Sequence, residues 1–267
     1  MPTTPRAVPV LFILGLLLSR PLQGQAAESV PTTALSADTA HAPAPVKLWH
    51  VGVALGGTAL ISIIDDDVQH WVMENRTQNA QDIADVVEEW GGFYVPIGVA
   101  VGTMGLGAII KKPEVTRTGV RVGVSVVGAG VVGQIMKLSI GRHRPSEADD
   151  QYTFSPFAGN SSFPSGHTLT AFAVSTTLAD AIDNTWADVG LYTLAAGTGV
   201  SRVIGNHHWV SDIVGGALVG ITTAKFVDGK WSLFGLKSPE FLTGPQGAGL
   251  KWTADIPALR GAPRARN

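Results

Sequence analysis

The 267-residue sequence contains no cysteine, which excludes disulfide scaffolds, cysteine-ligated zinc ribbons and thiol nucleophiles. Charged residues are scarce, at 15% of the chain against roughly 25% in an ordinary soluble domain. The formal net charge is -2, so the chain lacks the basic surplus typical of nucleic-acid-binding proteins. No nucleic-acid partner is therefore expected.

Apolar residues and glycine are abundant instead. Hydrophobic residues make up 45% of the chain, which also has 32 glycines, a composition that indicates close helix packing in or near lipid. At the N-terminus, Arg6 precedes an apolar run over residues 8–18 and a cluster of small residues ending at Ala27. This pattern predicts a secretory signal peptide over residues 1–27. The run is shorter than the ~20 residues of a spanning helix, and an uncleaved anchor helix is the alternative. Both interpretations place residue 28 outside the cytoplasm.

The rest of the chain divides into three segments. Residues 28–49 are rich in proline, alanine and threonine and are interpreted as a linker. Residues 50–230 form the predicted core domain, and residues 231–267 are predicted to be an irregular C-terminal tail. The core domain contains long apolar blocks rich in alanine, leucine and glycine, which favour helices over strands. These blocks cover residues 50–64, 92–110, 118–140, 167–182, 188–204 and 211–227. The predicted fold is all-α: a bundle of about six core helices, either membrane-embedded or soluble.

Glycine spacing in the apolar blocks supports close helix contacts. Gly52 with Gly56, and Gly216 with Gly220, have the four-residue spacing that lets helix backbones approach each other. General core packing explains this spacing as well as lipid-specific packing does.

Two other patterns resemble functional motifs but have simpler explanations. Gly128, Gly130 and Gly133 match the glycine pattern of dinucleotide-binding loops. That motif needs a preceding strand within a βαβ unit, and here it lies inside a helix-like block, so helix packing is the better interpretation. The triple carboxylate over residues 65–67 could indicate a metal site, but a solvated helix terminus is the expected explanation.

A first cluster of polar residues lies at the end of the third block. Lys137 precedes Arg144 by seven residues, which is about two helical turns, so both cations are expected on one face. Pro145 follows and prevents a regular helix from continuing. Two cations on one face favour an anion between them, although an unrelated pair of surface cations would give the same pattern.

A second cluster opens the fourth block with the sequence Pro164-Ser-Gly-His167. Ser165 is a good N-cap residue, and Gly166 lets backbone N–H groups approach a ligand. Unpaired N–H groups and the helix dipole make such a helix N-terminus a ready anion site. His167 can hold or donate a proton there. A plain helix cap is the simpler alternative for this cluster taken alone.

A third cluster comprises Arg202, His208 and Asp212. His208 and Asp212 are four residues apart, so one helical face can hold the carboxylate against the imidazole. This contact would orient the ring and leave its other nitrogen free to act. His207 fits that face less well, so the reactive role is assigned to His208. Arg202 adds a forked donor suited to phosphate oxygens.

Taken together, the three clusters predict phosphoryl transfer without a metal. Cations would stabilise charge on the equatorial oxygens, one histidine would attack, and the other would protonate the leaving oxygen. No cofactor is expected. A phosphorylated lipid or a small phosphate ester is the expected substrate, a membrane is the expected environment, and the sequence gives no oligomeric state.

The clusters also resemble a known family signature. The patterns Lys137-x6-Arg144-Pro, Pro-Ser165-Gly-His167 and Ser-Arg202-x5-His208-x3-Asp212 are similar to the three-part motif of the type 2 phosphatidic acid phosphatase family, which includes bacterial acid phosphatases, lipid phosphatases and vanadium haloperoxidases. The resemblance covers roughly residues 50–227. It implies a helical bundle and a phosphohistidine intermediate.

The resemblance also implies a role for each matched residue. His208 resembles the nucleophile, Asp212 its orienter and His167 the general acid. The phosphate clamp corresponds to Lys137, Arg144, Ser165, Gly166 and Arg202. A vanadate-dependent haloperoxidase and a non-catalytic membrane protein are the alternative functions.

The distribution of basic residues predicts the orientation in a membrane. Residues 111–117 contain two lysines and an arginine and form the densest basic connection of the core, so the positive-inside rule places them in the cytoplasm if the flanking blocks span. The loops at residues 141–166 and 205–211 would then face the periplasm. This orientation agrees with a translocated residue 28 only if the block at residues 50–64 does not span.

Overall fold

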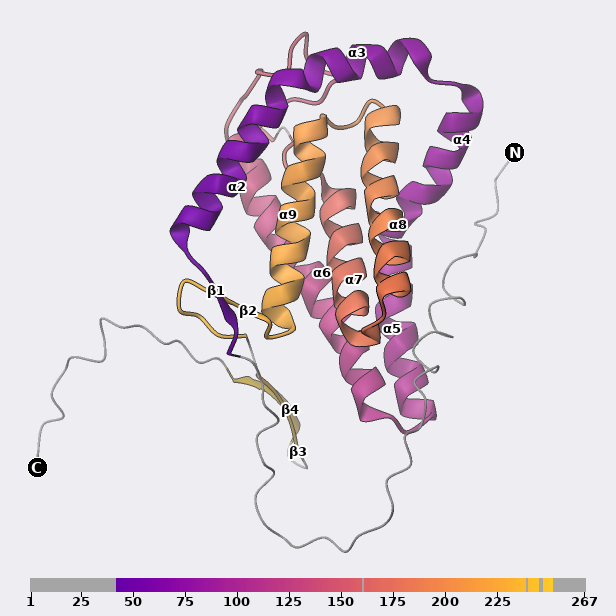
Figure 1. The fold of residues 1–267 in the computed structure, drawn as a ribbon, viewed down its shortest axis with the longest axis vertical. Helices are drawn as coiled ribbons and strands as arrows, with labels where there is room; N and C mark the ends of the chain where they lie inside the picture. Colours follow the sequence, from indigo (N-terminus) through magenta and orange to yellow (C-terminus); the bar gives the residue numbers. More distant parts are fainter. Residues whose placement is uncertain (1–41, 160, 239, 245–246, 252–267) are drawn as a thin grey trace, which may run out of the picture.

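The computed structural model describes residues 42–159, 161–238, 240–244 and 247–251. The predicted signal segment and most of the linker lie outside these residues. The chain is mostly helical, as Figure 1 shows, and the all-α prediction is confirmed. The α-helices are α2 (Leu48–Ile61), α3 (Asp65–Asn75), α4 (Gln78–Val87), α5 (Tyr94–Ile109), α6 (Pro113–Ile140), α7 (Gly166–Ile182), α8 (Thr185–Ile204) and α9 (Val210–Val227), with short 3-10 turns η1 (Ser62–Ile64) and η2 (Glu88–Gly91).

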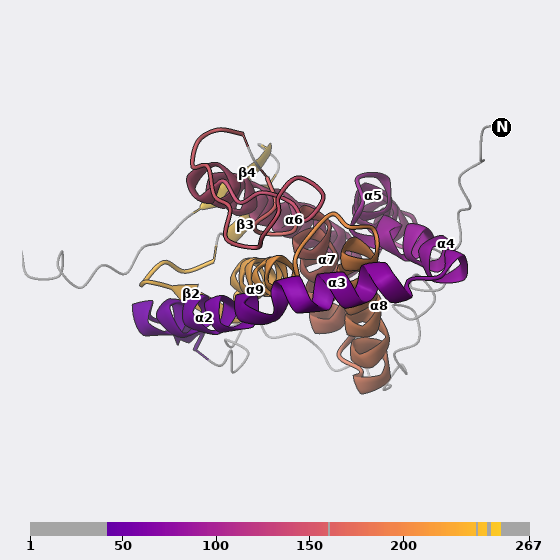
Figure 2. The same cartoon turned by 90° about the horizontal axis from the view of Figure 1, so that it is seen from above.

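The six predicted blocks correspond to α2 and α5 to α9, whereas α3 and α4 were not predicted. Both additional helices carry many polar residues. Helix α3 crosses one end of the bundle, and α4 runs down its side against α8. Figures 1 and 2 show α3 passing across the ends of α8 and α9. Helix α4 is preceded by the N-cap residue Thr77, whose hydroxyl accepts a hydrogen bond from the Ala80 N–H at 3.2 Å.

Helix α7 is the central element and packs against α6, α8 and α9. Glycines make this packing tight. A methyl group on Gly216 would lie 2.8 Å from the Ser165 carbonyl oxygen, and one on Gly220 would overlap the Leu169 carbonyl. Gly133 faces the Leu169 side chain in the same way. Gly133, Gly216 and Gly220 therefore serve helix packing, as predicted, whereas an added methyl group on Gly130 would meet no atom of the described residues within 4 Å.

The glycines of α2 behave differently. At Gly52 and Gly56, an added methyl group would meet no atom of the described residues within 4 Å. The expectation that this pair lets two helices approach is therefore not fulfilled within the described part of the chain. Helix α2 packs mainly against α9 and leaves most of its surface exposed.

Short strands flank the bundle. Strand β1 (Ala44–Val46) pairs in parallel with β2 (Trp231–Leu233), and β3 (Glu240–Gly244) pairs antiparallel with β4 (Gly247–Lys251). The described part of the C-terminal tail is thus more regular than the sequence indicated. The β1–β2 pairing thus joins the segment that precedes the helical bundle in the sequence to the segment that follows it. The two strands lie at the end of the bundle opposite α3.

The bundle has the length and surface of a membrane protein. Residues 48–75, 113–140 and 210–227 are each long and apolar enough to cross a membrane, and the bent pair formed by residues 78–91 and 94–109 would be a fourth span. Large apolar side chains face outward on these segments, among them Leu55, Val101, Ile109, Val127 and Ile135. The protein is therefore membrane-associated.

The two kinds of glycine predict different effects of substitution. We expect Gly220→Ala to destabilise the protein by about 1–3 kcal/mol, because the added methyl group overlaps backbone that cannot move freely. Gly52→Ala is the matched control and should leave stability unchanged or slightly raised, since it meets open space. Thermal unfolding of both variants in detergent micelles measures the difference. Equal melting temperatures would contradict the packing described for α7 and α9.

Candidate active site

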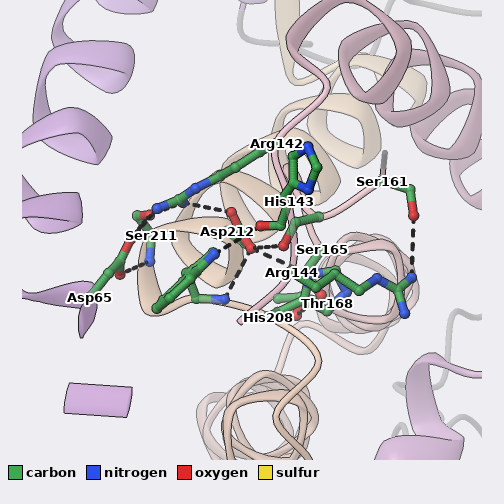
Figure 3. Close-up of polar contacts among 12 residues, drawn as sticks. Asp65, Arg142, His143, Arg144, Ser161, Ser165, Thr168, His208, Ser211 and Asp212 are labelled. Atoms are coloured by element: carbon green, nitrogen blue, oxygen red, sulfur yellow. Dashed lines mark hydrogen bonds and ion pairs between the residues drawn. The ribbon is translucent and has the colours of Figure 1, made fainter. Parts of the chain in front are cut away.

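The site lies where α6 ends and where α7 and α9 begin, near the end of the bundle crossed by α3 (Figure 3). The chain leaves α6 through Gly141, which has a φ of 61°. A side chain there would overlap the Ser155 carbonyl, so this turn requires glycine. The turn directs the following basic residues, Arg142 and Arg144, toward the N-terminal ends of α7 and α9.

The third cluster forms around a buried carboxylate. Asp212, in the first turn of α9, is fully buried, and its Oδ2 lies 3.4 Å from Nδ1 of His208. The same oxygen accepts hydrogen bonds from Ser162 Oγ at 2.5 Å and from the Trp209 N–H at 3.0 Å. The four-residue spacing thus brings His208 and Asp212 together, and further bonds fix the carboxylate.

The first cluster meets the loop that precedes α7. Lys137 Nζ donates to the Ser161 carbonyl, and Arg144 Nη2 donates to Ser161 Oγ at 3.2 Å. A methyl group on Gly166 would lie 4.0 Å from Lys137 Cε. The two cations therefore converge beside the N-terminus of α7. The prediction that they share one helical face is wrong, because α6 ends at Ile140 and Arg144 lies beyond its Gly141 cap.

Two predicted phosphate-binding groups already have partners. Arg202 pairs with Glu88 of η2 through its Nη1 atom. Ser165 is buried at the N-cap of α7, where its N–H donates to the Asp212 carbonyl and its Oγ accepts from Thr168, both at 3.0 Å. A phosphate would compete with Glu88 for Arg202.

Burial and the nearby cations control the protonation of both histidines. Burial lowers the pKa of His208 to about 4, against the opposing effect of Asp212 and with a further lowering by Lys137 and Arg144. The pKa of His167, in the first turn of α7 and outside the candidate spans, is also lowered to about 4, by burial and then by Arg202 and His208. Both rings are thus neutral at pH 7 until an anion enters. A bound phosphate would bring negative charge beside His167 and favour its protonated form.

Sequence reasoning missed several residues of the site, among them Asp65 and Arg142. Asp65 was expected to be part of a solvated helix terminus, but it is fully buried, and its Oδ2 lies 2.8 Å from Arg142 Nη2. Arg142 also reaches Asp212 Oδ1 at 2.8 Å. That expectation is wrong for Asp65, because the break between α2 and α3 directs its side chain into the bundle. Its partners are far away in the sequence, so spacing gave no signal for it.

The residues of the site show no metal-binding arrangement. Among the described residues, no group of three His, Cys, Asp or Glu side chains is placed to hold a metal ion. The carboxylates at the site instead face cations, hydroxyl groups and backbone N–H groups. Lys137, Arg144 and Arg202 are the cations that the predicted clusters contribute to this site.

Residues 118–228 match the sequence profile of the PAP2 superfamily. The chain is 29% identical over 240 residues to a lipid A 1-phosphatase of Porphyromonas gingivalis, covering 83% of this chain and 49% of that protein. It is 34% identical over 101 residues to a lipid A 1-phosphatase of Rhizobium johnstonii, covering 36% of this chain and 41% of that protein. The chain thus spans about half the length, or less, of the curated relatives it matches.

A solved structure supports the fold. The crystal structure of a transmembrane PAP2 type phosphatidylglycerolphosphate phosphatase from Bacillus subtilis superposes with a TM-score of 0.51 at 18% sequence identity. The superposition covers 68% of this chain and 96% of that one. At this level of identity the similarity concerns the helical architecture alone.

The lowered pKa of His208 predicts how stability depends on pH. The unfolded chain, in which this pKa is about 6.5, binds a proton before the folded chain does, so stability should fall as the pH decreases from 6.5 toward about 4. We expect His208→Asn to reduce this fall, although His167 still contributes to it. Melting temperatures measured across that pH range test the effect, with the exposed His70→Asn as control. Parallel curves for wild type and His208→Asn would contradict a buried neutral imidazole.

Proposed function

Because residues 118–228 form a PAP2 superfamily domain, we propose that this protein is a metal-independent phosphatase acting on a lipid phosphate or diphosphate in the cell envelope. The observation that carries the proposal is the buried His208–Asp212 pair, which lies beside the cations Lys137 and Arg144. A neutral imidazole, oriented by a carboxylate and adjacent to fixed positive charge, is suited to attack a phosphorus atom.

The proposed reaction has two steps, the phosphorylation of His208 and the hydrolysis of the phosphohistidine. First, Nε2 of His208 forms a bond to phosphorus as the bond to the leaving oxygen breaks, and His167 protonates that oxygen. Asp212 holds the Nδ1 side of the ring and stabilises its positive charge in the phosphohistidine. Second, His167 accepts a proton from water, whose oxygen displaces His208 and releases inorganic phosphate.

The clamp stabilises the charge of the transferring group. Lys137 and Arg144 approach from the end of α6, the N–H of Gly166 comes from the start of α7, and Arg202 comes from the end of α8. Positive groups around the equatorial oxygens act mainly by position and electrostatics. Arg202 would exchange Glu88 for a phosphate oxygen when the substrate binds, and Ser165 would contribute its hydroxyl as a further donor.

Three features favour a lipid as the substrate. The candidate spans place the site at the end of a membrane-embedded bundle. Tyr152, Phe154 and Phe157, in the loop before α7, are exposed and could contact acyl chains, whereas Phe163 is buried and packs near Gly215. The relatives from Porphyromonas and Rhizobium are lipid A 1-phosphatases, so the 1-phosphate of lipid A is the first substrate to test.

We also propose that the site faces the periplasm. Among the residues that the structure describes, most basic residues outside the site lie at the opposite end of the bundle: Lys47, Lys111, Lys112, Arg117, Lys225 and Lys230. The positive-inside rule favours the cytoplasm for that end. Residues 48–75 are a candidate span, and β1 lies at the basic end with β2. In this orientation residue 42 would lie on the cytoplasmic side, so it is an alternative to the expectation that residue 28 lies outside the cytoplasm.

The assignment of His208 predicts the effect of two neighbouring substitutions. We expect His208→Ala to reduce phosphate release from lipid A and from other lipid phosphates by at least ~1,000-fold, because the nucleophile is lost. His207→Ala should retain most of the activity, since His207 lies outside the pair with Asp212. Phosphate release by purified protein in detergent, with and without EDTA, measures both effects, and EDTA should leave the rate unchanged.

Other results of that assay would point to other functions. Activity in His208→Ala equal to that of wild type would contradict the phosphohistidine mechanism. Release from a soluble aryl phosphate alone would replace the lipid substrate with a small phosphate ester. If wild type releases no phosphate, halide oxidation by vanadate-loaded protein tests the haloperoxidase alternative, and a negative result there favours a non-catalytic protein.

The proposed orientation predicts which loops a membrane-impermeant reagent reaches. The sequence has no cysteine, so Asp149→Cys and Lys112→Cys each introduce one labelling site, both at exposed positions at opposite ends of the bundle. In cells with a permeabilised outer membrane, an impermeant maleimide should label Asp149→Cys and spare Lys112→Cys. Both variants should react after detergent lysis, which is the control. The reverse pattern would place the site in the cytoplasm.

A further inference from the structure

The structure assigns a positioning role to Asp65 and Arg142. We propose that they hold the Asp212 carboxylate against His208 and preserve its negative charge for the phosphorylated ring. This inference rests on the proposed phosphatase function. Neither residue belongs to the three sequence clusters, and Figure 3 shows the Asp65 and Arg142 side chains meeting beside Ser211 and Asp212.

Arg142 is almost completely buried, and its guanidinium group is fully engaged. Its Nε and Nη2 atoms donate to the Gln151 carbonyl at 3.0 and 2.8 Å. Its Nη1 atom donates to Ser211 Oγ at 2.7 Å and to Asp212 Oδ1 at 2.8 Å. Its Nη2 atom also donates to Asp65 Oδ2 at 2.8 Å. The planar guanidinium group of Arg142 therefore fixes the positions of the Asp65 and Asp212 carboxylates relative to each other, which the single ammonium group of a lysine could not do.

Asp65 also binds the start of α9 directly, in addition to its contact with the guanidinium group of Arg142. Its Oδ1 accepts the Ser211 N–H at 2.8 Å, and its Oδ2 accepts the Ser211 hydroxyl. Asp65 is thus bonded to the residue immediately before Asp212 as well as to Arg142. Burying three charges is costly, and an apolar contact of similar size is often at least as stable. Stability alone is therefore a poor explanation for the network.

The charge balance provides a better explanation. If Arg142 were paired with Asp212 alone, its positive charge would offset the charge of the carboxylate that faces His208. Asp65 takes the other edge of the guanidinium group, so the three residues together carry one net negative charge. The His208 ring becomes positively charged when it is phosphorylated, and this net charge lies next to it. Asp65 thereby stabilises the phosphohistidine without contacting the substrate.

The test uses the full-length protein and a substitution that keeps the shape of the side chain. Asp65→Asn should lower the single-turnover rate constant of phosphate release at least ~10-fold, as expected for a residue that orients a functional histidine. The rate constant does not depend on the fraction of folded enzyme. Inhibition by inorganic phosphate should stay unchanged, because Lys137 and Arg144 are untouched. Asp67→Asn, at an exposed position two residues away, is the control and should behave as wild type.

A second set of variants tests, without an activity assay, whether Asp65 and Asp212 share the positive charge of Arg142. Arg142→Gln leaves Asp65 and Asp212 as two buried carboxylates without their cation, so its melting temperature should fall strongly. The double variant Arg142→Gln with Asp65→Asn removes one of these charges and should recover part of the lost stability. A purely additive packing role would instead make the double variant the less stable of the two.

The outcomes separate this inference from the proposed function. A wild-type rate constant in Asp65→Asn, or a double variant less stable than Arg142→Gln, would overturn it. If wild type releases no phosphate from any substrate, the phosphatase proposal fails. In that case a double variant more stable than Arg142→Gln would still show that the two carboxylates share one guanidinium, while the role toward phosphohistidine would be overturned.

Discussion

The complete burial of the Asp212 carboxylate is the constraint on which the rest of the site depends. A desolvated carboxylate is tolerated only if each oxygen has hydrogen-bond or charge partners. Oδ2 receives the Ser162 hydroxyl and the Trp209 N–H and faces His208, and Oδ1 receives Arg142. These partners come from the loop before α7, the start of α9 and the end of α6. Satisfying one carboxylate thus fixes three parts of the chain relative to each other.

Helix packing brings these parts within reach. The glycines of α9 let its backbone approach α7 closely, and the methyl group that Gly216 lacks would meet the Ser165 carbonyl. The same proximity lets the Ser165 N–H donate to the Asp212 carbonyl. The N-termini of α7 and α9 are therefore held together, and their dipoles both favour negative charge at that end. The small residues in the apolar helices contribute to the electrostatics of the site as well as to its packing.

The sequence predicted the features that depend on local spacing. The six apolar blocks are helices, and the four-residue spacing of His208 and Asp212 places them in contact. Lys137 and Arg144 also lie close together, but through the turn that follows α6 and not along one helix face as predicted. The roles of these residues in a reaction remain predictions. Helices α3 and α4 escaped prediction because both carry many polar residues, α3 where it crosses the end of the bundle and α4 where it runs along the side of α8.

Asp65 could not have been predicted, because its burial depends on partners 77 and 146 residues further along the chain. Glu88 was missed for the same reason, since the Arg202 that it pairs with is 114 residues away. A run of three acidic residues is normally solvated, and only the fold shows that one of them points inward. The local sequence thus identified the groups suited to touch a phosphate but not the groups that hold them in place.

The cations of the site differ in the charge of the groups that they bind. Arg202 is held by Glu88, while Lys137 and Arg144 are held by the neutral Ser161. Neutral partners leave most of the positive charge available to an anion, whereas Glu88 offsets the charge of Arg202. A phosphate that displaces Glu88 therefore gains less from Arg202 than from the other two cations. On the proposed function, Lys137 of α6 and Arg144, which follows that helix, would consequently provide most of the attraction for a phosphate.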